Sequence, residues 1–362
     1  MNKTLKWPEV MSLAALNAAV VISWIAYHEY QPHLLEKFNF SGLAQLLVVA
    51  KAVILVLIPP VAGYVADRLM KKNGKFFTVF SIGIGATAMI FMVVATIIGA
   101  GPLSSVRPFL PVMVVLWLMA MNLFISPANS MIEAFAPAHK LPLVMGVLVL
   151  VTELIYALEP LVVALVNFFG DTLTFVVGGI LIAGTGFMFH KVSSDEVITR
   201  KKELIDRQQK KPAGTLGIMA IIIVGLQLGL GKALITEFLP HDLTGRFGFE
   251  SLTARYFSFA LLGLSAIVAF VVSRFSQNIS LRKLIYTGFT VLAIGVLGYL
   301  LVNNVTIALI FASVVAVAFA VINIAGIPFA INNLNVSQLT YGIGMFIGSS
   351  EVFGGLFEYL LP

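Results

Sequence analysis

The chain has 362 residues, of which 59% are hydrophobic and only 11% are charged, and its mean hydropathy is +0.99. A soluble domain carries about 25% charged residues, so this composition excludes an ordinary soluble protein and predicts a chain embedded in lipid. The sequence has no cysteine, which excludes disulfides, thiolate catalysis and thiolate metal sites.

Eleven segments are long and apolar enough to cross a membrane, since a spanning helix needs about 20 mostly apolar residues. In chain order they are 10–28, 42–66, 77–99, 108–133, 141–167, 172–190, 215–238, 252–273, 282–302, 305–330 and 336–360. The first follows Lys3 and Lys6 as a signal peptide would, but no small-residue cleavage site comes after it, so we expect a retained helix. The predicted fold class is an all-α polytopic membrane protein.

Most basic residues lie in alternate loops, chiefly within 68–75, 191–211 and 274–283. Loops rich in lysine and arginine stay in the cytoplasm, so the pattern predicts a multi-pass protein of the inner or plasma membrane with a cytoplasmic N-terminus. The net charge of +6 is then explained by orientation. We therefore expect no nucleic-acid partner.

One charged stretch, 191–214, separates six predicted spans from five. It is too charged to cross a membrane, and we expect a partly helical cytoplasmic linker. The predicted domains are an N-terminal six-helix bundle over 1–190 and a C-terminal bundle of five helices over 215–362.

The two halves share a weak internal repeat. Gly146 and Glu153 on the fifth span match Gly344 and Glu351 on the eleventh, with seven residues from each glycine to its glutamate. Prolines also end the apolar parts of spans four and ten, at Pro127 and Pro328. Duplicated halves are typical of transporters.

The loop after the second span reads "IPPVAGYVADRLMKKNGK" and contains Gly63, Asp67, Arg68 and Gly74. This spacing resembles the cytoplasmic signature of the major facilitator superfamily, in the form found in its sucrose-transporter and glycoside–pentoside–hexuronide branches. Glu133, in "SPANSMIEAFAP", is similar to the acidic residue at the end of span four, before a short loop, in the same group, where aspartate is usual. The resemblance implies a two-bundle fold, here with six and five helices. The superfamily has twelve spans, so a twelfth helix is expected to be missing or removed.

Asp67 is predicted to lie at a helix end among basic residues. A carboxylate there can bind the positive N-terminus of a neighbouring helix and a nearby arginine, which would latch one state of the two bundles. The other reading is a basic loop that only follows the topology.

Charged residues inside the spans are the next candidates, because each costs about 2.5–3.5 kcal/mol at the bilayer centre. Counting 1.5 Å per residue from the cytoplasmic side puts Lys51 and Glu351 about 24 Å deep. In the resembled fold their spans face each other, so we expect them to pair, either as a gate or as contacts that hold helices together.

Glu153 has no basic residue in its own half at the same depth, so it is our candidate proton carrier. Glu159 precedes Pro160, and its carboxylate is expected to bond backbone donors freed at a kink. Lys232 follows the glycine-rich run "GLQLGLG", which favours either local opening of the helix or a lysine that reaches the interface.

Candidate solute-binding residues come from the spans that line the central cavity of the resembled fold. Trp24, Tyr27 and Gln31 share one face of span one, and an aromatic face with an amide suits a sugar ring. The alternative is an interfacial aromatic belt. The further candidates are Asn122, Asn129, Gln227 and Asn323.

The resemblance therefore implies a secondary active transporter that takes up a sugar or glycoside by alternating access, coupled to a cation, with protons favoured over sodium. Its expected partners are a small-molecule solute and membrane lipid, and we expect a monomer. No enzyme activity, cofactor or metal site is indicated. Two alternatives stay open: the same fold transporting or exporting another solute, and a non-transporting sensor or assembly partner.

Overall fold

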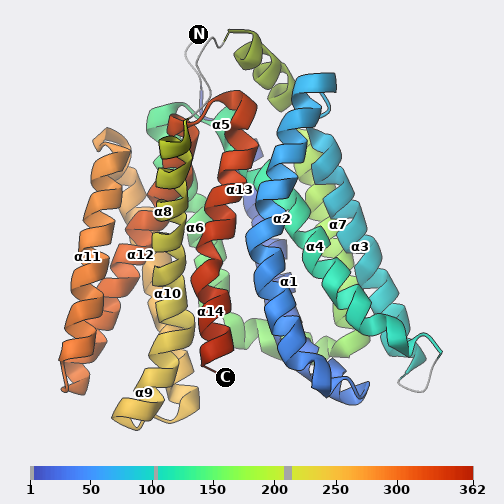
Figure 1. Cartoon of the computed structure of the whole chain (residues 1–362), viewed down its shortest axis with the longest axis vertical. Coiled ribbons are helices and arrows are strands. Elements are labelled where there is room, and N and C mark those ends of the chain that lie inside the picture. Colours follow the sequence, from blue (N-terminus) through green and yellow to red (C-terminus); the bar gives the residue numbers. More distant parts are fainter. Residues whose placement is uncertain (1–3, 102–104, 208–213, 362) are drawn as a thin grey trace.

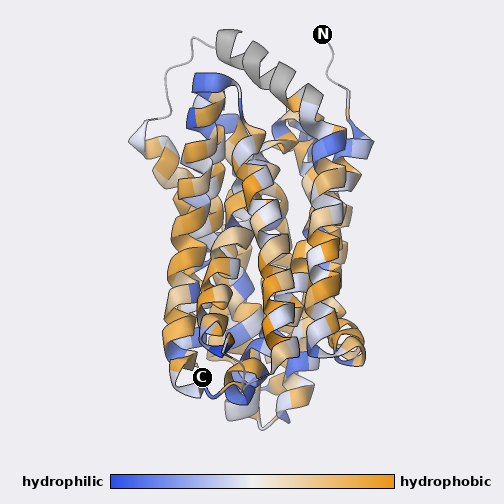
Figure 2. Ribbon diagram, turned by 90° about the vertical axis from the view of Figure 1, so that its right-hand side faces the viewer, coloured by the Kyte–Doolittle hydropathy of each residue, from blue (hydrophilic) through white to orange (hydrophobic). Residues whose placement is uncertain are grey.

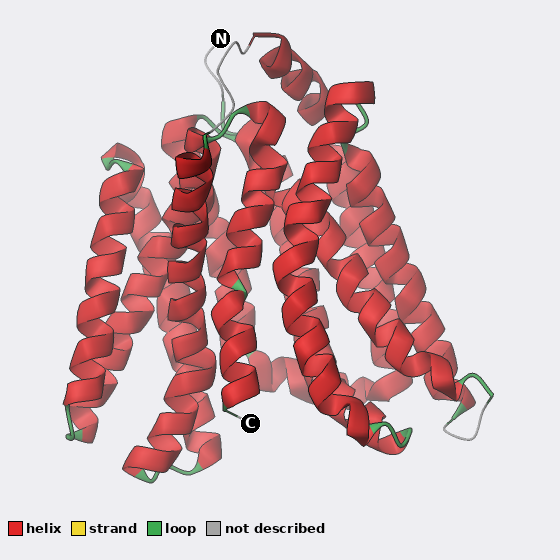
Figure 3. Ribbon diagram, in the orientation of Figure 1, coloured by secondary structure: helices red, strands yellow, loops and turns green. Residues whose placement is uncertain are grey.

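The computed structural model describes residues 4–101, 105–207 and 214–361, and every regular element in these ranges is a helix (Figures 1 and 3). The first half of the chain forms α1 Trp7–Lys37, α2 Ala44–Asn73, α3 Phe77–Ala100, α4 Leu110–Ser130, α5 Ile132–Phe135, α6 Leu141–Ala157 and α7 Glu159–Arg207. The second half forms α8 Thr215–Ala233, α9 Leu239–Phe247, α10 Ser251–Phe275, α11 Leu281–Leu301, α12 Val305–Asn333, α13 Leu339–Ser350 and α14 Val352–Leu360.

Among the described residues, ten helical segments are long and apolar enough to span a membrane. Hydrophobic residues cover the middle of the bundle, and hydrophilic ones gather toward its two ends (Figure 2). The eleventh predicted span, 336–360, is present as α13 and α14, which are interrupted at Glu351. The all-helical membrane fold is therefore confirmed.

The limits of the fifth span differ from the prediction. Helix α6 ends at Ala157, and the chain then runs across the bundle through 159–169 before α7 turns back (Figure 1). The turn is at Gly170, where φ is +73°. Hydropathy does not detect this change of direction, because both segments are equally apolar.

Helix α7 continues to Arg207, so the predicted linker is helical from residue 191 to that point. Its remaining part, residues 208–213, lies outside the described residues.

The most extensive contacts between the two halves are made by α2 and α6 of the first half. Helix α2 packs against α13 and α14, and α6 packs against α10. Glycines allow the backbones to approach, as is common between helices in membranes: a Cβ at Gly344 would collide with the carbonyl of Pro59, and one at Gly146 with the side chain of Ser273. Gly344 and Gly146 are the matched glycines of the repeat, so the repeat corresponds to two equivalent contacts between the halves.

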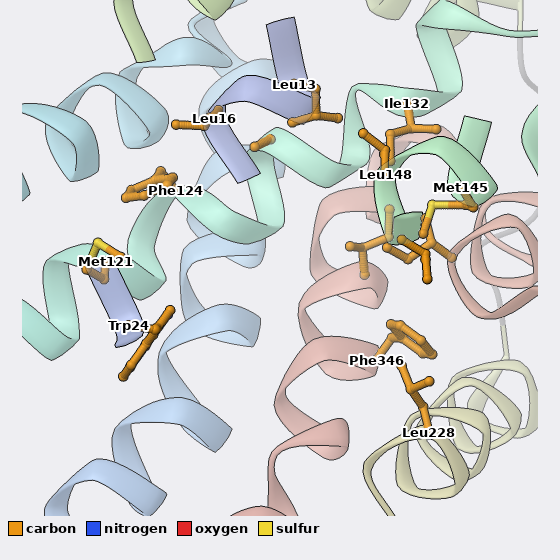
Figure 4. Packing of buried hydrophobic residues seen from close by; sticks show 14 of the residues in the cluster. Leu13, Leu16, Trp24, Met121, Phe124, Ile132, Met145, Leu148, Leu228 and Phe346 are labelled. Atoms are coloured by element: carbon orange, nitrogen blue, oxygen red, sulfur yellow. The ribbon is translucent and has the colours of Figure 1, made fainter. Parts of the chain in front are cut away.

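Buried apolar side chains complete each half. Figure 4 shows buried side chains of α1, α4, α5 and α6 from the first half, together with those of α8 and α13 from the second. Seven phenylalanines are among the largest side chains with under 2% exposure: Phe38, Phe76, Phe80, Phe124, Phe135, Phe189 and Phe319.

Candidate functional site

A cavity of about 900 Å³ lies between the two halves. Its lining extends to Thr244 on α9 and Leu361 at the end of the chain, so it reaches the end of the bundle opposite the N-terminus. At the N-terminal end the halves are in contact, with Gly63 against Thr340 and Gly344 against Pro59. The structure is therefore open at one end and closed at the other.

A smaller cavity of about 220 Å³ lies on the closed side of the larger one. Both cavities are lined by Glu153 and Tyr156 of α6, Lys232 of α8 and Glu351, which we call the inner cluster. The inner cluster forms a charged layer between the two cavities, with contributions from both halves of the chain.

Glu153 is the most buried member of the inner cluster. Its side chain is 5% exposed, and its Oε2 atom has no hydrogen-bond partner in the described structure. The ammonium of Lys232 lies 5.2 Å from the centre of the Tyr156 ring and feels the charges of Glu351 and Glu153. The base nearest the predicted proton carrier therefore comes from the other half of the chain.

Local helix irregularities place two members of the inner cluster. A π-helix, Leu234–Phe238, begins two residues after Lys232, and such bulges are frequent at functional sites. The glycine-rich run before Lys232, where a local opening was predicted, is regular helix within α8. Glu351 occupies the interruption between α13 and α14, close to four glycines of the eleventh span.

Lys51 pairs with Glu358 and not with Glu351. Its Nζ lies 2.6 Å from Glu358 Oε1 and 3.5 Å from His28 Nε2. The predicted partner of Lys51 was therefore wrong by two helical turns. The cause is the register between the contacting helices: Gly355 lies against Ala52, which puts Lys51 level with the C-terminal part of α14.

Glu159 also has a different partner from the predicted one. It does not bond freed backbone donors at a kink; it forms an ion pair with Arg255 of α10, at 3.3 Å. Like Lys51 with Glu358, this pair joins the first half of the chain to the second.

The predicted solute-binding residues are divided among three places. Trp24 and Asn122 line the larger cavity, and Asn129 and Asn323 line the smaller one. Among the described lining residues, Tyr27, Gln31 and Gln227 appear in neither cavity.

Tyr27, which helical spacing predicted to bind solute, packs against another helix instead. Its ring stacks on Trp117 of α4, with centroids 4.9 Å apart and planes 17° apart. Trp24 contacts the same indole edge-on at 5.2 Å. The shared face of α1 is therefore divided between packing on α4 and lining of the cavity.

The signature residues lie at the closed end. Asp67 accepts hydrogen bonds from the backbone N–H groups of Thr340 and Tyr341, at 3.3 and 2.8 Å, in the first turn of α13. The predicted contact with a helix N-terminus is thus present. Gly74 ends α2 with φ of +66°, a conformation that favours glycine. Arg68 is exposed, and Glu133 lies in the short helix α5.

Sequence reasoning missed Glu237, Glu358, Arg255 and Tyr156, all of which line the larger cavity. A second repeat would have pointed to Glu237: "EYQPHLL" begins at Glu29 and "EFLPHDL" begins at Glu237. An asparagine five residues before a proline also occurs in both halves, at Asn122 and Asn323.

The sequence model of the Major Facilitator Superfamily matches residues 10–357. None of the curated proteins gives a significant sequence match. Among solved structures, the human organic anion transporter MFSD10 (TETRAN) is similar with a TM-score of 0.69 and 12% identity, over 98% of this chain and 92% of that one.

Two sugar transporters are also similar in structure. The proton:xylose symporter XylE, bound to 6-bromo-6-deoxy-D-glucose, has a TM-score of 0.64 and 12% identity, over 98% of this chain and 88% of its own. The E. coli fucose:proton symporter FucP has a TM-score of 0.65 and 10% identity, over 97% of this chain and 96% of its own. Because the family model covers almost the whole chain and the fold is that of known transporters, the chain belongs to the major facilitator superfamily and is a multi-pass membrane transporter.

Proposed function

We propose that the chain is a secondary active transporter that couples uptake of a small polar solute to protons by alternating access, with a sugar or glycoside as the solute. The observation that carries this proposal is Glu153, a buried carboxyl group without a hydrogen-bond partner for Oε2, which lines both the larger and the smaller cavity. A buried acid inside a membrane is costly and is typical of proton relays.

Alternating access assigns a role to the contacts at the closed end. The hydrogen bonds from α13 to Asp67 and the close approach at Gly63 and Gly344 hold this end shut. In the other state these contacts separate and the cavity opens toward the N-terminal end. With a cytoplasmic N-terminus, as the loop charges favour, the present state faces outward.

The position of Lys232 supports proton coupling. Glu153 belongs to the first half and Lys232 to the second, so their attraction acts across the bundle. Protonation of Glu153 removes this attraction, and deprotonation of Glu153 restores it. The protonation of one carboxyl thereby changes the free energy of bringing the halves together, which is how a proton can drive a conformational equilibrium.

A sugar as the solute is supported by one aromatic side chain and two amides. Trp24 offers a ring to the larger cavity, and Asn122 lies on the same wall. The Nδ2 atoms of Asn122 and Asn129 donate to helix carbonyls at 2.8 and 2.9 Å, which leaves each Oδ1 to accept from hydroxyls. The similar structures XylE and FucP are sugar:proton symporters, and the sucrose and glycoside branches remain the predicted relatives.

A second candidate is the transport or export of a charged organic solute. It is favoured by the larger cavity, in which ionisable side chains outnumber amides. The charges of a solute would pair with them more effectively than hydroxyl groups would.

Uptake by proteoliposomes tests the proposal, with a panel of labelled sugars and an imposed proton gradient. The parent chain is expected to accumulate a sugar against its gradient. Glu153→Gln is expected to exchange the sugar but not to accumulate it, because it has no proton to carry. Proton-driven accumulation by Glu153→Gln would contradict the role of Glu153, and no movement of any solute would favour the sensor reading.

A further inference from the structure

The larger cavity has an excess of acidic side chains. Five carboxylates line it together with three basic groups, so with neutral histidines it carries two surplus negative charges. The carboxylates are Glu153, Glu159, Glu237, Glu351 and Glu358, and the bases are Lys51, Lys232 and Arg255. Uncompensated charge inside a membrane protein is expensive, so a ligand that neutralises it is favoured.

The surplus is divided between two places. Arg255 and Glu159 form one balanced pair. In the inner cluster, Lys232 is shared by Glu153 and Glu351. Toward the open end, Lys51 contacts Glu358 at 2.6 Å, while Glu237 lies farther off and feels both the repulsion of Glu358 and the attraction of Lys51 and Lys232. Each lysine therefore faces two carboxylates.

The proposed coupling proton accounts for only one of the two surplus charges. Glu153 is 5% exposed, lines the cavity, and has an unpartnered Oε2, so it is the natural acceptor of that proton. Glu237 then remains as a carboxylate with no basic nitrogen within 4 Å among the described side chains. It lies in the π-helix and reaches the cavity that Trp24 also lines.

We propose that the transported solute carries a positively charged amino group, which binds at Glu237 in the larger cavity. This inference rests on the proposed function and specifies the charge of its solute. An ammonium group there pairs with the carboxylate and leaves the ion pair of Lys51 and Glu358 intact. A neutral solute leaves one charge uncompensated, and an anionic solute adds another.

Three hexoses that differ in charge test this proposal: glucosamine, glucose and glucuronate. Their binding to the purified full chain is measured by titration of the thermal stability in detergent, which rises with the occupancy of the native state. Glucosamine is expected to bind at least about tenfold more tightly than glucose, and glucuronate more weakly than glucose.

Variants of one residue show whether the preference arises at Glu237. Glu237→Gln is expected to bring the affinity for glucosamine to that for glucose, whereas Glu237→Asp keeps the preference. The matched control is Glu29→Gln, at the equivalent position of the repeat. Glu29 accepts a hydrogen bond from Asn167 at 3.1 Å and is not among the cavity-lining residues described, so this variant should keep the parent's order.

Equal affinity for the three sugars, preference for glucuronate, no binding of any of them, or an unchanged preference in Glu237→Gln would each overturn the proposal. Proton-driven uptake without any preference for glucosamine would overturn this inference and leave the proposed function intact. Tight binding of glucosamine without proton-driven uptake would contradict the proposed proton coupling and leave the binding of an amino group at Glu237 intact.

Discussion

At the scale of single residues, the site depends on charged side chains whose partners come from the other half of the chain. Lys51 of α2 binds Glu358 of α14, and Glu159 of α7 binds Arg255 of α10. The acid of each pair lies shortly after a glutamate of the repeat: Glu159 is six residues after Glu153, and Glu358 is seven residues after Glu351. Each of these acids contacts a base on the facing helix. The duplicated halves thus contribute similar ion pairs to the two contacts between them.

The pair of Lys51 and Glu358 gives an asymmetric stability prediction. The Lys51 side chain is 7% exposed and that of Glu358 34%, so an unpaired lysine is harder to hydrate than an unpaired glutamate. Glu358→Gln is expected to lower the free energy of unfolding by about 3 kcal/mol, Lys51→Met by less, and the double variant by no more than Glu358→Gln.

Denaturant unfolding in detergent would measure these effects. Lys37→Met is the control, because the Lys37–Asp171 pair is 47% and 30% exposed and is expected to contribute under about 1 kcal/mol. Strictly additive losses in the double variant would show that the pair makes no specific contribution.

The sequence indicated which single residues are unusual but not which residues they contact. Glu153 and Asp67 were identified because a buried acid and an acid among basic residues are improbable without a role. Glu358 and Arg255 lie near span ends, where charges need no explanation, so nothing local distinguished them. Their importance depends on the register between helices, which is a tertiary property.

At the scale of helices, close backbone contact joins the halves at the closed end. Helix α13 approaches α2 so closely at Gly344 that a Cβ would overlap the carbonyl of Pro59. A Cβ at Gly354, on α14, would meet no atom within 4 Å. The two glycines therefore make a matched pair within one span.

Alanine at these positions should have opposite effects. Gly344→Ala is expected to destabilise the protein by about 1–3 kcal/mol, because α13 must move away from α2. Gly354→Ala should be neutral or stabilising by up to ~1 kcal/mol, since alanine favours a helix. Thermal unfolding compares them, and equal effects would show that the contact at Gly344 is not tight.

The N-terminus of α13 lies against Asp67 of α2, which accepts hydrogen bonds from two of the first backbone N–H groups of α13. Asp67→Asn removes the negative charge that stabilises this helix end, a contribution of about 0.3–2 kcal/mol. The closed end should then open more often. A cysteine at Thr340, which is fully buried here, should react faster in the Asp67→Asn background. Unchanged reactivity would show that Asp67 does not hold the end closed.

Hydropathy predicted the helices well and their interruptions poorly. The break at Glu351, the π-helix after Lys232 and the turn at Gly170 lie inside apolar sequence. The glycine-rich run before Lys232 predicted an opening within the run itself, but the run is regular helix and the π-helix begins after it. Three candidate site residues are at or next to the first two interruptions: Glu351 lies at the break, Glu237 in the π-helix and Lys232 just before it. Hydropathy therefore does not describe the parts of these helices that form the candidate site.

At the scale of the whole molecule, the two halves form a cavity that is open at one end and closed at the other. The sequence repeat explains this arrangement, since Gly146 and Gly344 make equivalent contacts across it. The fold and family were predictable because lipid permits few architectures and because the loop at Asp67 carries a family signature. The charges that line the cavity were not predictable as a group, because they come together only in three dimensions.

The central claim, that the two ends open in turn, is tested most directly by the reactivity of introduced cysteines. The chain has no cysteine of its own, so each introduced one reports alone. Thr244 lines the open cavity and Thr340 is buried at the closed end. When glucosamine and a proton gradient are supplied, Thr244→Cys is expected to react more slowly and Thr340→Cys faster. If Thr340→Cys stayed unreactive, or if both positions became accessible together, alternating access would be contradicted.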